Sequence, residues 1–446
     1  MKTPSLPPTT HVPQPYTGPS VAAVLAQRQQ FLNPGIFLYY QAPLMLVEGK
    51  LQYVWDDQGR RYLDGLGGIV TISVGHCHPH VVAAANRQNA ALQHATTLYL
   101  HPNVGTFAEH LAAKLPGDLK VCYFVNSGSE ANDLALLMAR AYTGNYDVIA
   151  LRNAYHGGNA SGMALTAHSS WKYNVPHSFG VHHALAPYPY RGPYGYEDLA
   201  AGRKYADDVK SLIEYATPGK VAAFIAESIQ GVGGCVEFPS GYLQHAYEHI
   251  RAAGGVCIAD EVQTGFGRTG THFWGFETQG VIPDIVTLAK GIGNGCPLAA
   301  VVTTAQIARS LTGKVHFNTF GGNPATTAMG KAVLEVIERE KLQANCLNQG
   351  TYLKAGLDRL KAKYPIIGDV RGQGLLLGVE LVKDRTTKEP APAACTAVLE
   401  ATRAMGLLIG KGGLWGQTIR LAPPMCLTRP DADFILEVFD AALAGL

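Results

Sequence analysis

Two stretches of the sequence decide the fold: VCIADEVQTG at residues 256–265 and PDIVTLAKG at residues 283–291. Each contains a short apolar run rich in β-branched residues, which is typical of a buried strand. The first run ends at Asp260, and the second ends at Lys290. Two such strands can bring a carboxylate and an amine to the same end of one sheet, which is the edge where open α/β sheets bind ligands.

A buried carboxylate at the end of an apolar strand is costly unless it has a partner. Pyridoxal 5′-phosphate (PLP) suits both groups, because its aldehyde forms a Schiff base with a lysine and its pyridine nitrogen stays protonated beside a carboxylate. The protonated ring is an electron sink, and the freed lysine amine can move a proton. The pattern therefore predicts Lys290 and Asp260 as catalytic residues, although a lysine in this position could also extend from the surface into solvent.

The pattern between residues 75 and 325 alternates strands with helices, which predicts an α/β fold with a mostly parallel sheet covered on both faces. We expect strands at 121–125, 147–152, 221–226, 256–260, 285–289 and 298–303, and helices at 129–142, 202–216, 241–253 and 304–312.

The flanking segments predict a smaller α+β domain built from residues 21–74 and 326–446, beside a large PLP-binding domain at 75–325. The first segment contains a hairpin pattern at 51–63. The second contains a long helical stretch at 326–363, strand material at 370–382 and 417–421, and helices near 392–405 and 430–443. Residues 1–20 hold six prolines and predict a flexible arm.

Small and polar residues follow other strands of the large domain. Ser127, Gly128 and Ser129 open a helix, whose free N–H groups and dipole favour a phosphate, although the same pattern also makes a plain helix cap with Glu130. Tyr155 and His156 follow the strand at 147–152, where an aromatic ring could stack on a planar cofactor or be an ordinary loop residue. Glu227 ends the strand at 221–226, where polar groups bind ligands or only cap the strand.

The composition excludes several functions. A formal charge of +2 gives no reason to expect nucleic acid or a membrane as partner, and the uncharged stretch 291–308 is too polar to span a bilayer. The eight scattered cysteines indicate small buried residues in a reducing compartment. The first twenty residues resemble neither a secretory signal nor an arginine-rich presequence, so we expect a cytoplasmic location. Only 16% of the residues are charged, which favours an oligomer.

Three histidines, His76, His78 and His80, look like metal ligands at first sight. They lie in a turn-rich segment without a matching acid or cysteine group, so we interpret them as part of a turn and expect no metal site.

Taken together, the motifs resemble the class III PLP-dependent aminotransferases of fold type I over residues 35–440. The motifs that carry the resemblance are NSGSEAND (126–133), YHG (155–157), ADEVQTGFGR (259–268), LAKG (288–291) and NTFGGNP (318–324). Within the class, GHCHP (75–79), FWGF (273–276) and KGIGNG (290–295) are most similar to the group of alanine–glyoxylate aminotransferase type 2 and β-amino acid–pyruvate aminotransferases.

The resemblance implies roles for further residues. Val262 and Tyr155 would pack on the two faces of the PLP ring, Gln263 would approach its phenolic oxygen, and Arg420 would hold the substrate carboxylate. Gly128 and Ser129 would bind the phosphate. Thr319 would reach the phosphate of a neighbouring subunit, which requires a homodimer with shared active sites, possibly a dimer of dimers. From the sequence alone, Arg420 could equally be a surface residue on a strand.

Departures from the family pattern concern the substrate. Ornithine and 4-aminobutyrate members carry a glutamate after Gln-Gly that gates the arginine, whereas Val232 stands at that position here. Arg420 is therefore expected to stay open to the carboxylate of alanine, pyruvate or glyoxylate. Gly158 stands where acetylornithine enzymes place an arginine, and Gly68 to Thr71 lack the tryptophan of many amine transaminases. Ser228 stands where most of the class has proline, without a functional explanation from the sequence.

These observations predict an aminotransferase that moves an amino group from alanine or a β- or ω-amino acid to an oxo acid in two half-reactions. An amino-acid epimerase or decarboxylase on the same scaffold stays open, because these enzymes share the cofactor residues, and so does an amine or ω-amino acid:pyruvate transaminase. A non-catalytic binding protein on an old enzyme fold is a further alternative, against which the intact Lys290 and Asp260 argue.

Overall fold

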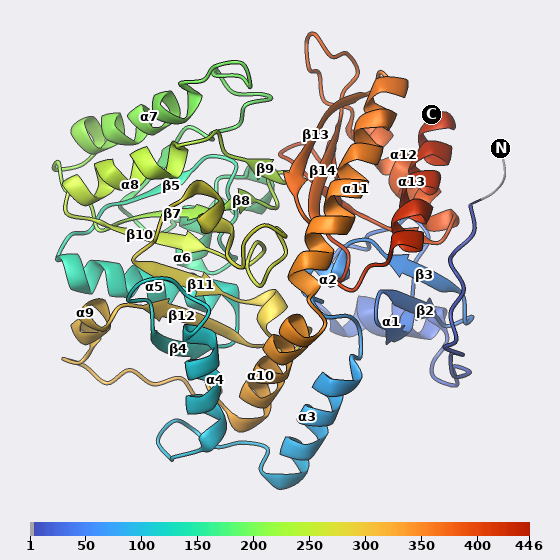
Figure 1. Cartoon of the computed structure of the whole chain (residues 1–446), viewed down its shortest axis with the longest axis horizontal. Helices are drawn as coiled ribbons and strands as arrows, with labels where there is room; N and C mark the ends of the chain where they lie inside the picture. The colour runs from blue at the N-terminus through green and yellow to red at the C-terminus, as the bar shows by residue number, and fades with distance from the viewer. Residues whose placement is uncertain (1–3) are drawn as a thin grey trace.

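The computed structural model describes residues 4–446, and its largest sheet has seven strands in the order β4-β12-β11-β10-β7-β5-β6 (Figure 1). These strands are β4 (Val121–Val125), β5 (Val148–Leu151), β6 (Val181–Ala184), β7 (Ala223–Glu227), β10 (Val256–Asp260), β11 (Ile285–Leu288) and β12 (Ala299–Thr303). All neighbours pair in parallel except β12, which is antiparallel to both β11 and β4. The predicted α/β fold with a mostly parallel central sheet is confirmed.

Helices cover both faces of this sheet because alternate strand residues point to opposite sides. Val256 and Ile258 of β10 pack into a cluster with α5 (Gly128–Thr143). Cys257 and Ala259 point to the other face, which is covered by α7 (Ala201–Ala216) and α8 (Tyr242–Ala252). Strands β5, β7, β10, β11 and β12 are consequently buried along their whole length, which explains their continuous apolar sequences, whereas β4 and β6 are partly exposed.

Two further sheets of four strands each lie beside the large sheet, on the right in Figure 1. One is built from β1 (Leu46–Lys50), β2 (Tyr53–Asp56), β3 (Arg61–Asp64) and β15 (Leu407–Leu408), so it combines residues from both ends of the chain. The other contains β13 (Ile367–Gln373), β14 (Leu376–Leu381), β17 (Thr418–Leu421) and β16 (Gly410–Gly412). Helices α11 (Leu342–Lys363), α12 (Pro392–Ala404) and α13 (Arg429–Ala444) pack with these sheets. The residue boundaries of the two domains stay a prediction.

The remaining elements connect these parts. They are α1 (Val21–Phe31), α2 (Gly67–Val70), α3 (Pro79–Ala91), α4 (Pro102–Ala112), α6 (Ala160–Leu165), α9 (Ala305–Ala308), α10 (Pro324–Arg339), β8 (Ile229–Gln230), β9 (Val236–Glu237) and the 3-10 turns η1 (Ser169–Trp171), η2 (Gly275–Gln279), η3 (Lys290–Ile292) and η4 (Arg309–Leu311). The hairpin expected at 51–63 is present as β2 and β3.

The structure differs from the sequence expectations in several places. The helical stretch 326–363 is two helices, α10 and α11, because Lys341 adopts a left-handed φ of 52° between them. The strand material at 370–382 lies within a hairpin, in which Gly374 turns with a φ of 54°. The helix expected at 304–312 is α9 followed by η4, and β6 was missed because its His182 and His183 interrupt the apolar pattern. Helices α3 and α4 were also missed.

The N-terminal residues run alongside the sheet of β1, β2 and β3. Pro7 O accepts a hydrogen bond of 2.6 Å from Arg61, and Glu48 accepts one of 2.9 Å from the Gln14 backbone N–H. The His11 ring lies 4.8 Å from the Trp55 ring. The predicted arm also includes residues 1–3, which lie outside the described residues, and its flexibility stays a prediction.

Two further expectations concern the cysteines and the membrane. The eight cysteines are all free, and four of them are buried, but Cys77 is exposed, so the expectation of buried cysteines is wrong there. Within residues 4–446, none of the helices combines the length and the apolar character that a bilayer span requires.

Candidate active site

The carboxyl ends of five strands form one edge of the large sheet, and the sequence-predicted residues meet there. Ser127 follows β4, Tyr155 follows β5, Glu227 ends β7, Asp260 ends β10, and Lys290 follows β11. They border a cavity of about 400 Å³, a size that suits a small cofactor with its substrate. Its lining also contains five other predicted residues, Gly128, Ser129, His156, Val262 and Gln263.

Asp260 is buried, with 4% of its surface exposed, and three donors hold its carboxylate. Oδ2 accepts hydrogen bonds from His156 Nδ1 at 2.7 Å and Asn132 Nδ2 at 2.9 Å, and Oδ1 accepts one from the Val262 N–H at 3.1 Å. Burial raises the pKa of Asp260, but these hydrogen bonds outweigh burial and hold the pKa below its ordinary value. Asp260 is therefore an anion that faces the cavity.

An ionised carboxylate offers about four acceptor positions. Two donors occupy Oδ2 and one occupies Oδ1, so one position on Oδ1 has no donor within residues 4–446. A protonated pyridine nitrogen is a single donor of the required kind, and Asp260 thus fits the ring of PLP.

Lys290 begins the turn η3 with a left-handed φ of 47°, which a lysine rarely adopts. Its pKa is lowered from 10.5 to about 8, first by burial and then by the positive charge of Arg420, while Asp260 and Glu227 oppose the shift. A lowered pKa leaves more of the amine neutral, as attack on an aldehyde and proton transfer require. Lys290 fits the covalent attachment of PLP.

The N-terminus of α5 provides the anion site. Ser127 Oγ accepts a hydrogen bond of 3.2 Å from the Glu130 N–H, which leaves the N–H groups of Gly128 and Ser129 as free donors of the first turn. Gly157 closes over Ser129 with a φ of 128°, and a Cβ there would lie 2.5 Å from Ser129 Oγ. The turn therefore leaves space for a phosphate. The alternative of a plain helix cap is present in part, since Ser127 caps the Glu130 N–H, but the Glu130 carboxylate accepts from Asn126 instead of Ser127.

Tyr155 and Val262 line the cavity from different strands. Glu227 Oε1 accepts a hydrogen bond of 3.0 Å from the Tyr155 N–H, and the Tyr155 ring packs edge-on against Trp171, 5.2 Å away. Val262 lies against Gly128, where a Cβ would be 3.3 Å from its methyl group. Their positions suit the ring-stacking roles that the family resemblance implies. Glu227 acts on the backbone, since its Oε2 also accepts from the Gly231 N–H at 2.8 Å.

Arg420 does not line the cavity and lies behind Gln263 on β17. It is 3% exposed, and its Nη2 donates a hydrogen bond of 2.5 Å to Gln263 Oε1, while its Nε has no partner within residues 4–446. The expectation of an open Arg420 is thus modified, because an amide oxygen occupies one of its donors. The guanidinium has a neutral partner here instead of a carboxylate, and the approach of Gln263 to the phenolic oxygen of the cofactor stays a prediction.

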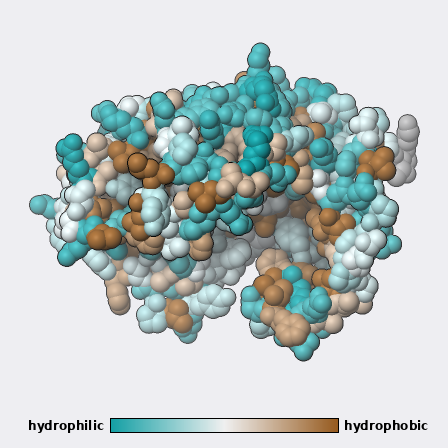
Figure 2. Space-filling model, turned by 90° about the horizontal axis from the view of Figure 1, so that it is seen from below, coloured by the Kyte–Doolittle hydropathy of each residue, from teal (hydrophilic) through white to brown (hydrophobic). Residues whose placement is uncertain are grey.

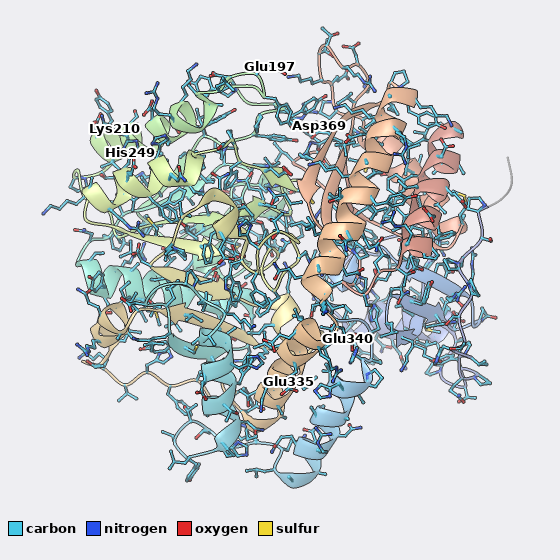
Figure 3. The ribbon with its side chains drawn as sticks, viewed as in Figure 1. Glu197, Lys210, His249, Glu335, Glu340 and Asp369 are labelled. Carbon is cyan, nitrogen blue, oxygen red and sulfur yellow. The ribbon has the colours of Figure 1, made fainter. Side chains whose placement is uncertain are left out.

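Thr319 is exposed and lies outside the cavity. Its contact with the phosphate of a second subunit stays a prediction. The three histidines of the turn contact three different carboxylates: His76 with Asp64 at 2.8 Å, His78 with Glu340 at 3.1 Å and His80 with Glu335 at 2.6 Å. Glu335 and Glu340 lie along and after α10, near α3 (Figure 3).

The sequence analysis missed several residues that line the cavity: Thr71, Asn132, Gly295, Cys296, Pro297 and Leu298. Asn132 follows Gly128 by one helical turn and therefore lies on the same face of α5, a spacing that could have indicated it. Residues 295–298 precede β12, and they reach this edge only because β12 runs antiparallel. Ser228 has a structural role, since its hydroxyl donates to the buried Glu261, which also accepts from Thr264 and from the backbone of Gly275 and Phe276.

A carboxylate, a lysine with a lowered pKa and a helix N-terminus around one cavity at the strand ends define a PLP-dependent enzyme of fold type I. Comparisons agree with this class. The family model for class III aminotransferases matches residues 39–443, and the chain belongs to this family. Its cofactor is PLP, and the resemblance that the motifs indicated is confirmed.

Three known proteins illustrate the similarity. The alanine–glyoxylate aminotransferase 2 homolog 2 of Arabidopsis thaliana, named as mitochondrial, is 54% identical over 99% of this chain and 91% of its own length. An Arthrobacter phospholyase in complex with phosphoethanolamine is 35% identical, with a TM-score of 0.89 over 95% of this chain and all of the other. An amine transaminase from an uncultivated Pseudomonas species, in its PLP-bound form, is 32% identical, with a TM-score of 0.87 over 93% and 98%.

Proposed function

We propose that this class III aminotransferase takes the amino group of alanine or of a β- or ω-amino acid and passes it to an oxo acid such as glyoxylate or pyruvate. The observation that carries this substrate assignment is the buried Arg420, whose guanidinium has only the neutral Gln263 oxygen as a side-chain hydrogen-bond acceptor within residues 4–446. A buried cation without an anionic partner favours a substrate carboxylate. The name of the Arabidopsis thaliana relative supports the same donor and acceptor.

Bound PLP supplies an aldehyde that carries the amino group and a ring that accepts electrons from the substrate carbon. Asp260 would accept a hydrogen bond from the ring nitrogen and so favour its protonated form. Lys290 Nζ would take the proton from the substrate carbon and return it to the former aldehyde carbon, which lies on the other side of the transferred nitrogen. Arg420 pairs with the substrate carboxylate after the Gln263 oxygen moves aside, which orients the amino acid over the ring.

A single-turnover experiment tests this function. The PLP-loaded enzyme is given ¹⁵N-alanine without an oxo acid, and we expect one equivalent of pyruvate for each active site. Glyoxylate added after removal of free alanine should then yield ¹⁵N-glycine. D-Alanine or carbon dioxide in place of pyruvate would instead support an epimerase or a decarboxylase. The same experiment with β-alanine compares alanine with the β-amino acids as amino donors.

A substitution separates the role of Arg420 from that of the cofactor. Arg420→Leu removes the charge and should raise the KM for alanine about 30- to 150-fold, as expected for a lost charge-assisted pair of about 2–3 kcal/mol. An amine substrate without a carboxylate should show no comparable rise. Equal losses for both substrates would contradict the assignment of Arg420 to the carboxylate.

We propose further that the protein works as a homodimer with shared active sites. Thr319 is exposed, and large apolar side chains around it and elsewhere are exposed as well, including Leu100, Val315 and Phe320. Figure 2 shows hydrophobic residues between hydrophilic ones on the face seen from below, which is also hollowed. Exposed apolar surface of this kind favours a protein partner. Sedimentation of the purified protein tests the stoichiometry.

For the location, we propose the cytoplasm. The eight free cysteines support a reducing compartment, whereas the Arabidopsis thaliana relative is named as mitochondrial. Fractionation of the native cells with an antibody against the protein decides the question, and recovery in a mitochondrial fraction would overturn the proposal.

A further inference from the structure

Asn132 is a buried residue of α5, 2% exposed, that reaches the cavity from the same helix that offers the phosphate site. Its Nδ2 donates to Asp260 Oδ2 at 2.9 Å and to the carbonyl oxygen of His156 at 2.9 Å. His156 itself donates to the same Asp260 oxygen at 2.7 Å. Asn132 therefore holds both the carboxylate and the backbone of the histidine that supports it.

The surroundings fix the orientation of the Asn132 amide. Both neighbours of Nδ2 are acceptors, whereas Oδ1 is buried without a partner within residues 4–446. A rotation of the amide by 180° would place its oxygen against the Asp260 carboxylate and the His156 carbonyl, where no donor is available. The amide is thus locked as a double donor.

The two donors on Oδ2 determine which oxygen of Asp260 meets the cofactor. Because His156 and Asn132 occupy Oδ2, the vacant acceptor position is on Oδ1, beside the Val262 N–H. Asn132 also follows Gly128 by four residues, so about 6 Å of helix separates the phosphate-binding turn from the residue that holds Asp260. One rigid element therefore sets the spacing between the phosphate and the ring-nitrogen partner.

We propose that Asn132 is a positioning residue that directs Asp260 Oδ1 toward the ring nitrogen of PLP and links it to the phosphate site through α5. This inference rests on the role of Asp260 given under the proposed function. Asn132 acts only through Asp260, so its effect depends on the presence of the ring nitrogen. A role limited to the folding of α5 would affect any ligand with the same shape and phosphate.

Cofactor binding tests this dependence without measuring activity. The dissociation constants of the full-length apoprotein are measured for PLP and for its carbocyclic analogue, in which a C–H replaces the ring nitrogen. Asn132→Leu keeps the size of the side chain and removes both donors, and Asn132→Ala serves as a second variant if the first does not fold. Asp260→Asn is the reference, and Asn145→Leu is the matched control, since the side-chain amide of Asn145 donates to the Val221 carbonyl, away from the cavity.

We expect Asn132→Leu to weaken PLP binding about tenfold and to leave binding of the carbocyclic analogue within about twofold of the unsubstituted protein. Asn145→Leu should change neither. Equal weakening for both ligands, or no weakening for either, would overturn the proposal. If Asp260→Asn also failed to distinguish the two ligands, the role of Asp260 itself would be wrong, which separates the failure of the proposed function from that of Asn132.

Discussion

Asp260 and Glu227 lie opposite each other on the neighbouring parallel strands β10 and β7, and their pKa values are shifted in opposite directions. Burial raises the pKa of both carboxyls. At Asp260, hydrogen bonds from His156 and Asn132 outweigh burial and lower the pKa. Within residues 4–446, Glu227 accepts hydrogen bonds from backbone N–H groups alone, and its pKa is raised. Of these two carboxyls, Asp260 is therefore the one whose surroundings favour the ionised form, as a partner of the ring nitrogen requires.

Asp260→Asn should lower kcat about 100- to 1000-fold, because the neutral amide no longer holds the ring nitrogen protonated. Glu227→Gln, its neighbour of the same chemical class, should reduce kcat far less, because Glu227 bonds only backbone groups. Steady-state kinetics with alanine and glyoxylate measure both effects. Equal losses in the two variants would show that burial alone, not the ionised state of Asp260, matters at this edge.

The lowered pKa of Lys290 predicts that the rate of PLP binding depends on pH. Its amine must be neutral to attack the aldehyde, and its pKa is about 8, so the rate of PLP uptake by the apoprotein should rise with pH and level off above about pH 8. Arg420→Leu removes a charge that lowers this pKa and should move the midpoint to higher pH. Stopped-flow absorbance gives both midpoints. A midpoint near the ordinary value of 10.5 in the unsubstituted protein would contradict the effect of burial.

Gly157 and its neighbour Gly158 are two adjacent glycines at which the same substitution should have different effects. Gly157→Ala should weaken PLP binding and destabilise the fold by about 1–3 kcal/mol, because the new Cβ would meet Ser129 Oγ at 2.5 Å in a backbone with a φ of 128°. Gly158→Ala should be nearly neutral, since nothing lies within 4 Å of its Cβ position. Calorimetry and PLP titration measure the two effects, and similar losses in both variants would remove the steric explanation.

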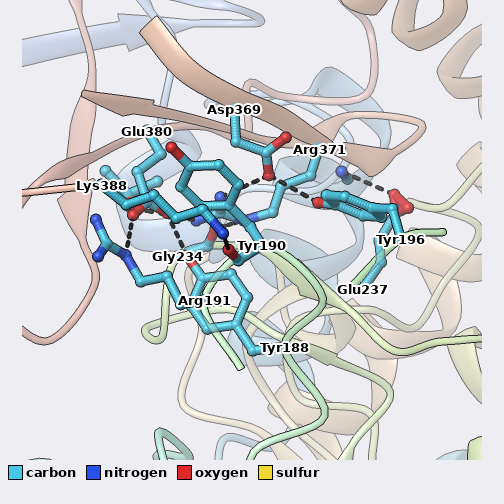
Figure 4. A network of polar contacts seen from close by, with 12 residues as sticks. Tyr188, Tyr190, Arg191, Tyr196, Gly234, Glu237, Asp369, Arg371, Glu380 and Lys388 are labelled. Atoms are coloured by element: carbon cyan, nitrogen blue, oxygen red, sulfur yellow. Dashed lines mark hydrogen bonds and ion pairs between the residues drawn. The ribbon is translucent and has the colours of Figure 1, made fainter. Parts of the chain in front are cut away.

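A buried polar network joins the loop after β6 to the sheet of β13 and β14 (Figure 4). The fully buried Glu380 pairs with Arg371 at 2.7 Å and with Arg191, and it accepts a hydrogen bond from Tyr188. Burial raises the pKa of Glu380, but the two arginines prevail and hold it below its ordinary value. Its stabilisation is therefore present above the unfolded-state pKa and is lost as the pH falls through the lower folded-state pKa.

Glu380→Gln should lower the free energy of unfolding at pH 7 by about 3–5 kcal/mol, because the partly buried Arg191 loses its counter-ion and the buried Arg371 keeps only Asp369. The acid side of the stability–pH curve should also become flatter. Glu389→Gln is the control, since its pair with Lys383 is exposed and contributes less than about 1 kcal/mol. Denaturant titrations between about pH 3 and 8, which covers the range in which carboxyl groups titrate, measure the stability of both variants. A small loss in Glu380→Gln would mean that the network contributes little.

Hybrid dimers test the shared active site. A Lys290→Ala chain and a Thr319→Arg chain should each form enzymes of low activity, because the first lacks the lysine and the second would block the phosphate of its partner's site. Mixed in equal amounts after dissociation, they should regain up to about a quarter of the normal activity, since half of the dimers are hybrids and each hybrid has one intact site. No recovery in verified hybrids would place Thr319 outside the neighbouring site.

The sequence indicated the central strands and the residues at their ends because these signals are local. An apolar run followed by Asp260 or Lys290 can be interpreted without knowledge of the rest of the chain. The predictions were wrong where local signals were absent. No glycine or proline marks the break between helices at Lys341, and His182 and His183 interrupt the apolar pattern of β6. The direction of β12, which brings residues 295–298 to the cavity, depends on pairing with β11 and β4 and has no local signal.

The sequence by itself indicated the chemistry: Asp260 and Lys290 at the ends of buried strands, together with the family motifs, predicted PLP. The tertiary structure decided how these groups are held. Asn132 contacts Asp260 across 128 positions, and Arg420 contacts Gln263 across 157. Contacts at such separations follow from strand order and helix packing, because the direction and distance of a hydrogen bond depend on three-dimensional positions that spacing along the chain does not define.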